Sequence, residues 1–411
     1  MCLAHRSFVP ICQKIIFEHV AIYPDIYRLF NLLLILNASP HLASYIRFLI
    51  VNFNDNMLCS LPEGLGTYAI LVKINNLRHL RISRGLPSFF STGYDWKTLG
   101  PQFIAQLLRL ISLPSLESLA MCEFKNFPFH GLLQLKNSPS LRILELRNFG
   151  LDPDVSQASS IDALQLAAPP SRSLLIWTVS HRSVTSVEAL TTGGSKSRYR
   201  NHLIFDLTQL RKFHTQWDNL DEASAGKSVI ESAPNIEELV CLLPRYSSNF
   251  VDFDGLAQSI LERPFEALRS LDLIVMEDIT EEAEADPFNS TITALTKLSG
   301  GIPRLEKLII RFFYFLLSDE ELQDLLRDLD ERLVLLDEVF ANRSDFSSLH
   351  TVSIRFFFTV ADDKPDEEDV EDYKDRCRRI EVNNLDNLRK LERQTESGFD
   401  FDFAFLLGWE Y

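Results

Sequence analysis

A short pattern of apolar and polar positions recurs along the 411-residue chain and reads apolar-x-x-apolar-x-apolar. In its last half apolar and polar residues alternate, which is the period of a strand with one buried face. In four copies a proline stands two residues before the first apolar position, where it ends any preceding helix. We therefore expect a strand in every copy. The nine copies begin at Ile46, Leu77, Leu116, Leu141, Leu210, Ile236, Leu268, Leu305 and Leu349.

Segments with helical spacing lie between these predicted strands. Residues 103–111 carry one apolar stripe and residues 292–298 carry another. A further helix is predicted from Ser318, because its hydroxyl and the carboxylate of Glu321 form a capping box ahead of a leucine stripe. At the amino terminus, residues 6–20 are expected to form a helix and residues 26–36 a second apolar segment, and together they are expected to cap the open end of the sheet.

The longest interval between two copies, from Leu141 to Leu210, predicts one degenerate unit. Residues 161–166 fit the pattern, and so does the apolar run 174–179, and the sequence leaves both alternatives open. Residues 191–197 are rich in Gly, Ser and Thr, which indicates a surface loop. A unit of one strand and one helix cannot bury its apolar side alone, so neighbouring units are expected to stack. The predicted fold class is α/β, a solenoid with a curved parallel sheet on one side and helices on the other.

The stacked units also predict a surface for a binding partner. The residue between the last two apolar positions of each copy points away from the core, so stacking places these residues in one row. That row contains Ile50, Arg81, Ala120, Glu145, His214, Val240, Asp272, Ile309 and Ser353, and the next outward row includes Arg147, Arg311 and Arg355. From the two rows we take Arg81, Glu145, Arg147, His214, Asp272, Arg311 and Arg355 as candidate partner-binding residues. For any one of them, an ordinary solvated surface position is the alternative.

Charge is distributed unevenly along the chain, which has a formal net charge of −16. Residues 277–286 contain six acids and no base, and residues 319–338 and 362–375 each contain nine acids and two bases. An acidic chain without a clustered basic face is not expected to bind nucleic acid or an anionic membrane. With neither a signal sequence nor a transmembrane span in the sequence, the expected location is cytoplasmic or nuclear. Most of the six scattered cysteines are expected to be buried thiols.

Motifs that would carry catalytic chemistry are incomplete. The segment Ala225-Gly226-Lys227-Ser228 is similar to the end of a phosphate-binding loop, but the first glycine of that motif is replaced by Asp221. Residues 252–254 and 400–402 each read Asp-Phe-Asp, which places two carboxylates on one side of an extended strand, and we interpret them as solvated Asp beside buried Phe. We therefore expect no catalytic, cofactor-binding or metal-binding residues, and no cofactor.

Several segments resemble a known family. Residues 138–149, which read SPSLRILELRNF, resemble leucine-rich repeats of the long, irregular kind found in fungal F-box proteins. Residues 2–17 are similar to the end of an F-box, and residues 39–47 to the entry into the first repeat. The resemblance implies an F-box-like helical cap over residues 1–40, a leucine-rich-repeat-like solenoid over residues 41–361, and an acidic segment with a carboxy-terminal cap over residues 362–411.

The same resemblance implies a function. F-box proteins of this kind are substrate receptors of cullin ubiquitin ligases, so a non-catalytic protein–protein interaction scaffold is expected, with a protein partner of unknown identity. The opening of the F-box would precede Met1, so a Skp-type adaptor is an expected partner only if an upstream extension exists. The alternatives are a cytosolic repeat scaffold without a ligase role and a hydrolase or transferase whose active site is assembled from distant residues.

Overall fold

The computed structural model assigns the chain to two compact units, Met1–Leu207 and Thr208–Tyr411, here called unit 1 and unit 2. It describes residues 8–23, 25–53, 67–84, 94–128, 131–132, 134–152, 174–180, 207–245, 253–261, 266–278, 287–316, 325, 329, 332–340, 346–360, 378, 388 and 399–409. Both units are α/β and contain thirteen strands between them, and every described pairing is parallel. The predicted α/β class with parallel strands is confirmed.

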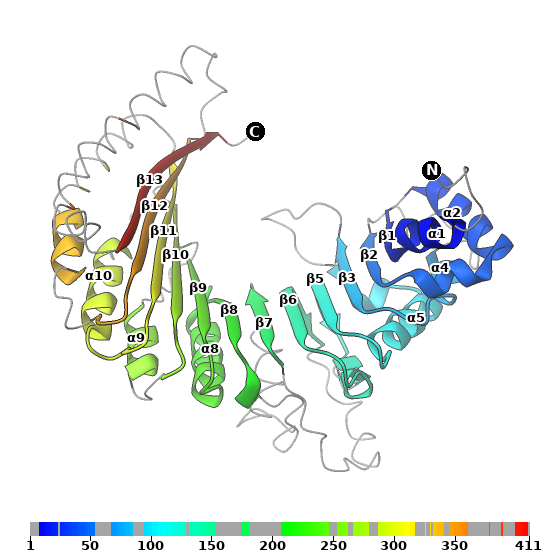
Figure 1. The fold of residues 1–411 in the computed structure, drawn as a ribbon, viewed down its shortest axis with the longest axis horizontal. Helices are drawn as coiled ribbons and strands as arrows, with labels where there is room; N and C mark the ends of the chain where they lie inside the picture. The colour runs from blue at the N-terminus through cyan, green and yellow to red at the C-terminus, as the bar shows by residue number, and fades with distance from the viewer. Residues whose placement is uncertain are drawn as a thin grey trace. The chain divides into compact units, whose positions relative to one another are not determined.

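Unit 1 contains an open parallel sheet in the strand order β1-β2-β3-β5-β6-β7, with β4 paired to β5 (Figure 1). Helix α5 begins at a proline, whose fixed φ suits the first helical turn, and it buries Phe103, Leu107 and Leu110. The elements are α1 (Val9–Glu18), β1 (His19–Ile22), α2 (Ile26–Ala38), η2 (Pro40–Tyr45), β2 (Phe48–Phe53), α4 (Thr67–Leu71), β3 (His79–Arg84), β4 (Tyr94–Asp95), η3 (Trp96–Thr98), α5 (Pro101–Ile111), β5 (Ser118–Phe127), η4 (Gln134–Asn137), β6 (Ile143–Leu151) and β7 (Ile176–Ser180).

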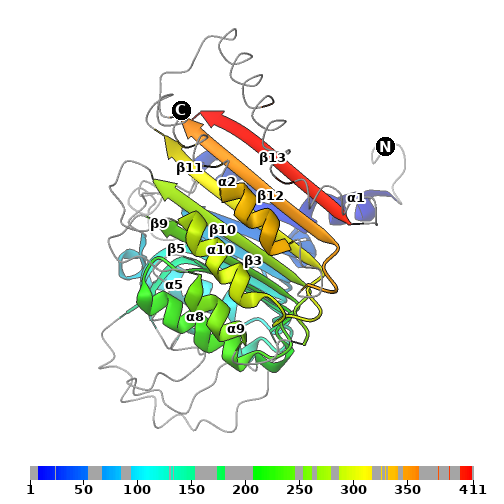
Figure 2. The same cartoon turned by 90° about the vertical axis from the view of Figure 1, so that its left-hand side faces the viewer.

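Unit 2 contains an open parallel sheet in which each strand lies beside its neighbours in the chain, from β8 to β13. Figure 2 shows helices α8, α9 and α10 side by side on one face of the strands. The elements are η6 (Leu207–Gln209), β8 (Lys212–Gln216), α8 (Leu220–Ser232), β9 (Glu238–Arg245), α9 (Asp254–Leu261), β10 (Ser270–Asp278), α10 (Pro287–Leu298), β11 (Lys307–Leu316), β12 (Thr351–Val360) and β13 (Asp400–Trp409).

The recurring pattern marks its strands accurately. Each of the nine strands begins two residues after the first apolar position of its copy, as β5 does at Ser118 after Leu116. Strand β7 begins two residues after Leu174, which agrees with the second alternative for the degenerate unit. The first alternative, residues 161–166, and the predicted loop 191–197 lie outside the described residues.

The predicted helices are confirmed on the described residues, except that the one expected over residues 6–20 ends at Glu18 and is followed by β1 from His19. The stripes at 103–111 and 292–298 lie in α5 and α10, and the two amino-terminal segments contain α1 and α2. Residues 332–340 are helical, whereas the predicted helix start at Ser318 lies outside the described residues. None of the helices that the structure describes combines the length and apolar character needed to cross a membrane.

The core of unit 2 lies between the strands and the helices and is rich in aromatic rings. Phe312 on β11 and Phe356 on β12 stack with their centroids 5.0 Å apart, and Phe288 of α10 stacks on both. Each of these three side chains is 0% exposed. This ring cluster therefore joins the strands to the helical layer.

Two described cysteines are buried free thiols, as expected. Burial, together with the nearby carboxylate of Glu145, raises the pKa of Cys122 to about 11. Burial also raises the pKa of Cys241 well above the ordinary value of a thiol. Both thiols therefore stay protonated and poorly nucleophilic near pH 7. Cys12 on α1 is disulfide-bonded, a pairing that the sequence did not predict.

The acidic stretches have a common position in the topology. Residues 277–286 begin in the last two residues of β10, residues 319–338 follow β11, and residues 362–375 follow β12. These three strands are adjacent and parallel, so their carboxyl ends lie side by side at the same end of the unit 2 strands. The three acidic stretches therefore continue the chain from the carboxyl ends of three neighbouring strands.

The segment Ala225-Gly226-Lys227-Ser228 lies within α8, as interpreted from the sequence. Gly226 is needed there because the buried indole of Trp217 occupies the space where a Cβ would be. We expect Gly226→Ala to lower the free energy of unfolding by about 1–3 kcal/mol, because overpacking outweighs the gain of about 1 kcal/mol in helix propensity. Urea unfolding measures the change.

Gly255→Ala on α9 is the matched control for this substitution. Its Cβ would meet the end of the flexible Lys227 side chain, which can move aside. Its unfolding free energy is expected to stay within about 0.5 kcal/mol of wild type. Equal stability of the two variants would contradict the packing role of Gly226.

Candidate partner-binding face

The outward face of unit 2 is formed by strand side chains that point away from the helical layer. On β11, Phe312 points inward to Phe288 of α10, so its neighbours Arg311 and Phe313 point outward. The parallel register aligns such residues in rows across the sheet. The first row is His214, Val240, Asp272, Ile309, Ser353 and Asp402, and the second is Gln216, Leu242, Ile274, Arg311, Arg355 and Ala404.

The candidate residues from the sequence fall into two groups. Arg81, Glu145 and Arg147 belong to unit 1, where Ala120 of β5 stands in register between Arg81 and Glu145. Glu145 and Arg147 form an ion pair of 2.6 Å between Oε1 and Nε. The other four candidates, His214, Asp272, Arg311 and Arg355, belong to unit 2, where the ion-pair network is more extensive.

Asp272 and Arg311 form the most buried ion pair of the described outward face. Arg311 Nη2 donates to Asp272 Oδ2 over 2.6 Å, while Oδ1 is buried and accepts no hydrogen bond from the described residues. Asp272 is only 6% exposed, although the sequence pattern predicted an open position, because its neighbours and the Arg311 side chain cover it. Burial raises the pKa of Asp272 to about 6, and the positive charge of Arg311 offsets only part of this effect.

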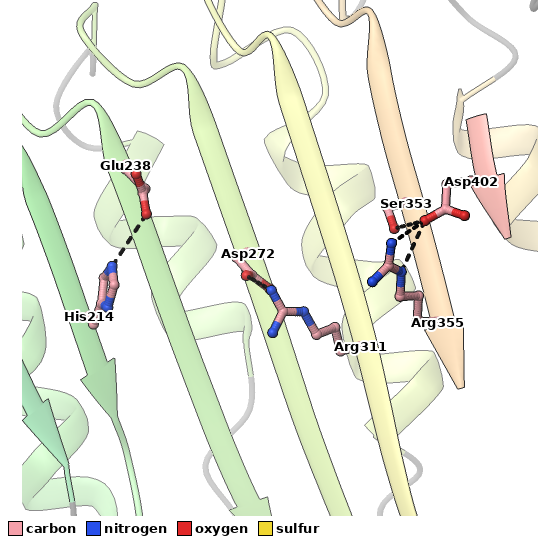
Figure 3. A network of polar contacts seen from close by, with 7 residues as sticks. All are labelled: His214, Glu238, Asp272, Arg311, Ser353, Arg355 and Asp402. Atoms are coloured by element: carbon pink, nitrogen blue, oxygen red, sulfur yellow. Dashed lines mark hydrogen bonds and ion pairs between the residues drawn. The ribbon is translucent and has the colours of Figure 1, made fainter. Parts of the chain in front are cut away.

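Arg355 makes a separate set of contacts at the next pair of strands (Figure 3). Its Nε and Nη2 donate to Asp402 Oδ2 over 3.0 and 2.6 Å, and the hydroxyl of Ser353 donates to the same oxygen over 2.9 Å. Burial raises the pKa of Asp402, but these hydrogen bonds outweigh burial, so the net pKa lies below its ordinary value. Arg311 and Arg355 stand in register on the adjacent strands β11 and β12. Each pairs with a carboxylate on the neighbouring strand that lies away from the other arginine, Arg311 with Asp272 on β10 and Arg355 with Asp402 on β13.

His214 lies at the other end of the network. Its Nε2 is 3.4 Å from Glu238 Oε1, and Lys212 Nζ donates to Glu238 Oε2 over 2.5 Å. Burial raises the pKa of Glu238, but the hydrogen bonds from Lys212 and His214 together lower it below its ordinary value. Glu238 therefore remains ionised and holds both bases at this end of the face.

Apolar side chains surround the arginines on the same face. The rings of Phe313 and Phe357 stack with their centroids 4.3 Å apart and 4° between their planes. Leu406, in register with Phe357, is 43% exposed. Val240, Leu242, Ile274, Met276, Ile309 and Phe313 are partly exposed, as is Phe357. Arginine and aromatic side chains together are typical of the central residues of protein interfaces.

Two members of the network were missed as candidates from the sequence. Glu238 is the first residue of β9, a position that the pattern left unassigned. Asp402 on β13 was interpreted as solvated; its side chain is 44% exposed, and it also forms an ion pair with Arg355 of β12. The alternation of Phe and Asp from residue 399 was the signal for this strand. The other Asp-Phe-Asp interpretation was wrong about the strand, because α9 begins at Asp254, although Phe253 is buried as expected.

The outward face of unit 2 combines paired charges with partly exposed apolar side chains. Within the described parts of the chain, no group of three His, Cys, Asp or Glu side chains is arranged to hold a metal ion. No family model matches this chain, and no curated protein matches it.

Proposed function

We propose that the chain is a non-catalytic binding protein that holds a protein partner on the outward face of unit 2. The observation that carries this proposal is the partly exposed Phe313–Phe357 stack beside two arginines in register. Such a surface provides apolar contact area together with guanidinium donors that can bind a carboxylate or a carbonyl oxygen. In the free protein, ion pairs with Asp272 and Asp402 hold the two arginines in place.

The repeated strand pattern supports the finer part of the proposal, a leucine-rich-repeat-like solenoid. Proteins of that class commonly bind partners on the exposed face of the sheet. The resemblance of residues 2–17 and 138–149 to F-box proteins supports a substrate-receptor role, in which the bound protein is presented to a ubiquitin ligase. A repeat scaffold without a ligase role uses the same surface and differs only in the absence of an adaptor.

The double variant Phe313→Ala and Phe357→Ala tests the binding face. We expect at least a tenfold loss in capture of the partner, because truncation of a central aromatic side chain costs about 2 kcal/mol or more of binding free energy. The immobilised chain is exposed to a cell extract, and the captured proteins are identified and quantified by mass spectrometry. A partner of this face is a protein that wild type retains and the variant loses.

Arginine variants give the matched comparison. Arg311→Gln with Arg355→Gln removes the positive charges of these two arginines without placing a new carboxylate beside Asp272 or Asp402. This double variant is expected to reduce capture of the partner as well. Arg211→Gln with Arg269→Gln removes two exposed arginines that pair with Glu237 and Glu306 at the starts of their strands, and is expected to leave capture unchanged. Equal capture by all three double variants and wild type would exclude the outward face as the binding site.

A further inference from the structure

Exposed apolar side chains are concentrated on the two amino-terminal helices of unit 1. Ile15 and Ile16 on α1 are each 65% exposed, and Tyr27 on α2 is 84% exposed. Helix α1 has no buried residue at all. The remaining large exposed residues of this region are Phe8, Val9, Ile11, Tyr23, Ile26, Phe30, Leu34 and Ile35. These eleven side chains are here called the amino-terminal apolar surface.

The helical spacing shows that this exposure is organised in stripes. On α2, Ile26, Phe30 and Leu34 recur every four residues and share one side of the helix, while Leu29, Leu33 and Leu36 are buried on another side. On α1, Ile11 and Ile15 are also four residues apart. Both helices pack on η2, and they lie at the β1 end of the unit 1 sheet (Figure 1). Helix α2 therefore covers unit 1 with one side and keeps a second apolar side exposed, whereas the apolar side chains of α1 are all partly or largely exposed.

The area of the amino-terminal apolar surface is that of a stable interface. A large apolar side chain has on the order of 200 Å² of accessible surface. Eleven residues with exposed fractions between 37% and 84% then leave roughly 1,000 Å² accessible. A standard protein interface buries about 800 Å² on each partner, and the largest apolar patch of a typical monomer is about 300–600 Å².

The charges around this surface determine which partner fits. The charged side chains of residues 8–18 and 25–38 are Lys14, Glu18, Asp25 and Arg28. Their charges sum to zero, and Asp25 and Arg28 are paired at 3.1 Å. The net charge of −16 comes from unit 2, because residues 1–207 contain 19 Lys and Arg against 13 Asp and Glu, so two copies that approached through unit 2 would repel each other. At the neutral amino-terminal apolar surface two copies can meet without that repulsion. A two-fold axis needs just such a surface, since it places the same patch on both sides of the interface.

We propose that the protein forms a homodimer through the amino-terminal apolar surface of two copies. The stripes of α1 and α2 form the centre of the contact, and the four balanced charges lie at its rim. Strand β1 is the first strand of its sheet, and among the described strands it pairs with β2 alone. The edge of β1 that faces away from β2 lies at the same end of unit 1 as α1 and α2.

The test is the molecular mass of the full chain in solution, measured by sedimentation equilibrium from 1 to 100 μM. We expect the mass of two chains for wild type and the mass of one chain for the double variant Ile15→Glu with Ile16→Glu. Four carboxylates in the contact, two from each copy, are expected to weaken association at least a hundredfold. Both residues are 65% exposed, so circular dichroism is expected to show an unchanged fold.

A matched control and a second variant complete the test. Val334→Glu with Leu335→Glu changes two adjacent, exposed helical residues of unit 2 and is expected to remain dimeric. Tyr27→Glu on α2 is expected to weaken the dimer as well, and it tests the surface independently if the α1 variant fails to fold. A wild-type chain that is monomeric at 100 μM would overturn the proposal. A dimer that persists in both the α1 and the α2 variants would overturn it too.

Discussion

Phe356→Ala is expected to lower the free energy of unfolding of unit 2 by about 4 kcal/mol. The Phe356 ring is fully buried and lies against the rings of Phe288, Phe312 and Phe403. The rings of Tyr314, Phe358 and Phe405 also contact it. Truncation removes the transfer free energy of the ring and leaves a cavity among stiff aromatic neighbours that cannot close it. Urea unfolding monitored by circular dichroism gives the change.

Phe357→Ala is the control for this prediction, because the next residue along β12 points to the opposite face. Its ring stacks on Phe313 and is partly exposed, so its truncation is expected to cost about 1 kcal/mol or less. The ratio of the two effects measures how strictly β12 separates the core face of the sheet from its outward face. A similar loss in both variants would show that the outward pair is part of the core.

The second large effect concerns pH and Asp272. The pKa of this carboxyl rises from an ordinary value of 3.8 to about 6 in the folded protein, because it is buried. The folded state therefore binds the proton more tightly than the unfolded state, and the stability contributed by protonated Asp272 is lost as pH rises through about 6. This pKa shift contributes about 3 kcal/mol to the free energy of unfolding at low pH. About 1.4 kcal/mol of that contribution is lost between pH 5 and pH 8.

The variant Asp272→Asn isolates this effect, since it cannot titrate. We expect the unfolding free energy of wild type, relative to this variant, to fall by about 1.4 kcal/mol from pH 5 to pH 8. Asp402→Asn is the control, because the pKa of Asp402 is lowered, so its contribution is lost only below pH 4. Its difference from wild type is expected to be the same at pH 5 and pH 8. A constant difference for Asp272→Asn would mean that Asp272 is ionised throughout this range.

The strands could be predicted from the sequence where the apolar pattern is complete. The repeated pattern does not mark β13, because Gly398 stands where its first apolar residue would be, and only the alternation of Phe and Asp indicated an extended strand over residues 400–402. Strand β1 was missed even though Phe17, Val20 and Ile22 fit the pattern, because these residues were assigned to a helix and its end. The two-residue strand β4 is too short to carry any periodic signal.

The candidate face was predicted in its register but not in its contacts. Alternation within a strand fixes which residues point outward, and parallel stacking aligns them, so Arg311 and Arg355 could be placed in one row. Which carboxylate each arginine selects depends on side-chain rotamers and on the neighbouring strand, and neither follows from a one-dimensional pattern. The burial of Asp272 was missed for the same reason, because a polar residue at an outward position is expected to be solvated.

The sequential strand order of unit 2 bears on how its sheet can assemble. Residues in register on neighbouring strands are separated by 26 positions between β8 and β9 and by 49 between β12 and β13. The entropy of closing loops of these two lengths differs by only about 0.6 kcal/mol. Chain connectivity therefore favours no particular pair of strands as the folding nucleus. The side chains then decide, and the rings of β11 stack on those of β12 along both strands. We therefore expect the sheet to begin to form at this pair, one strand in from β13, and to grow from there toward β8 and β13.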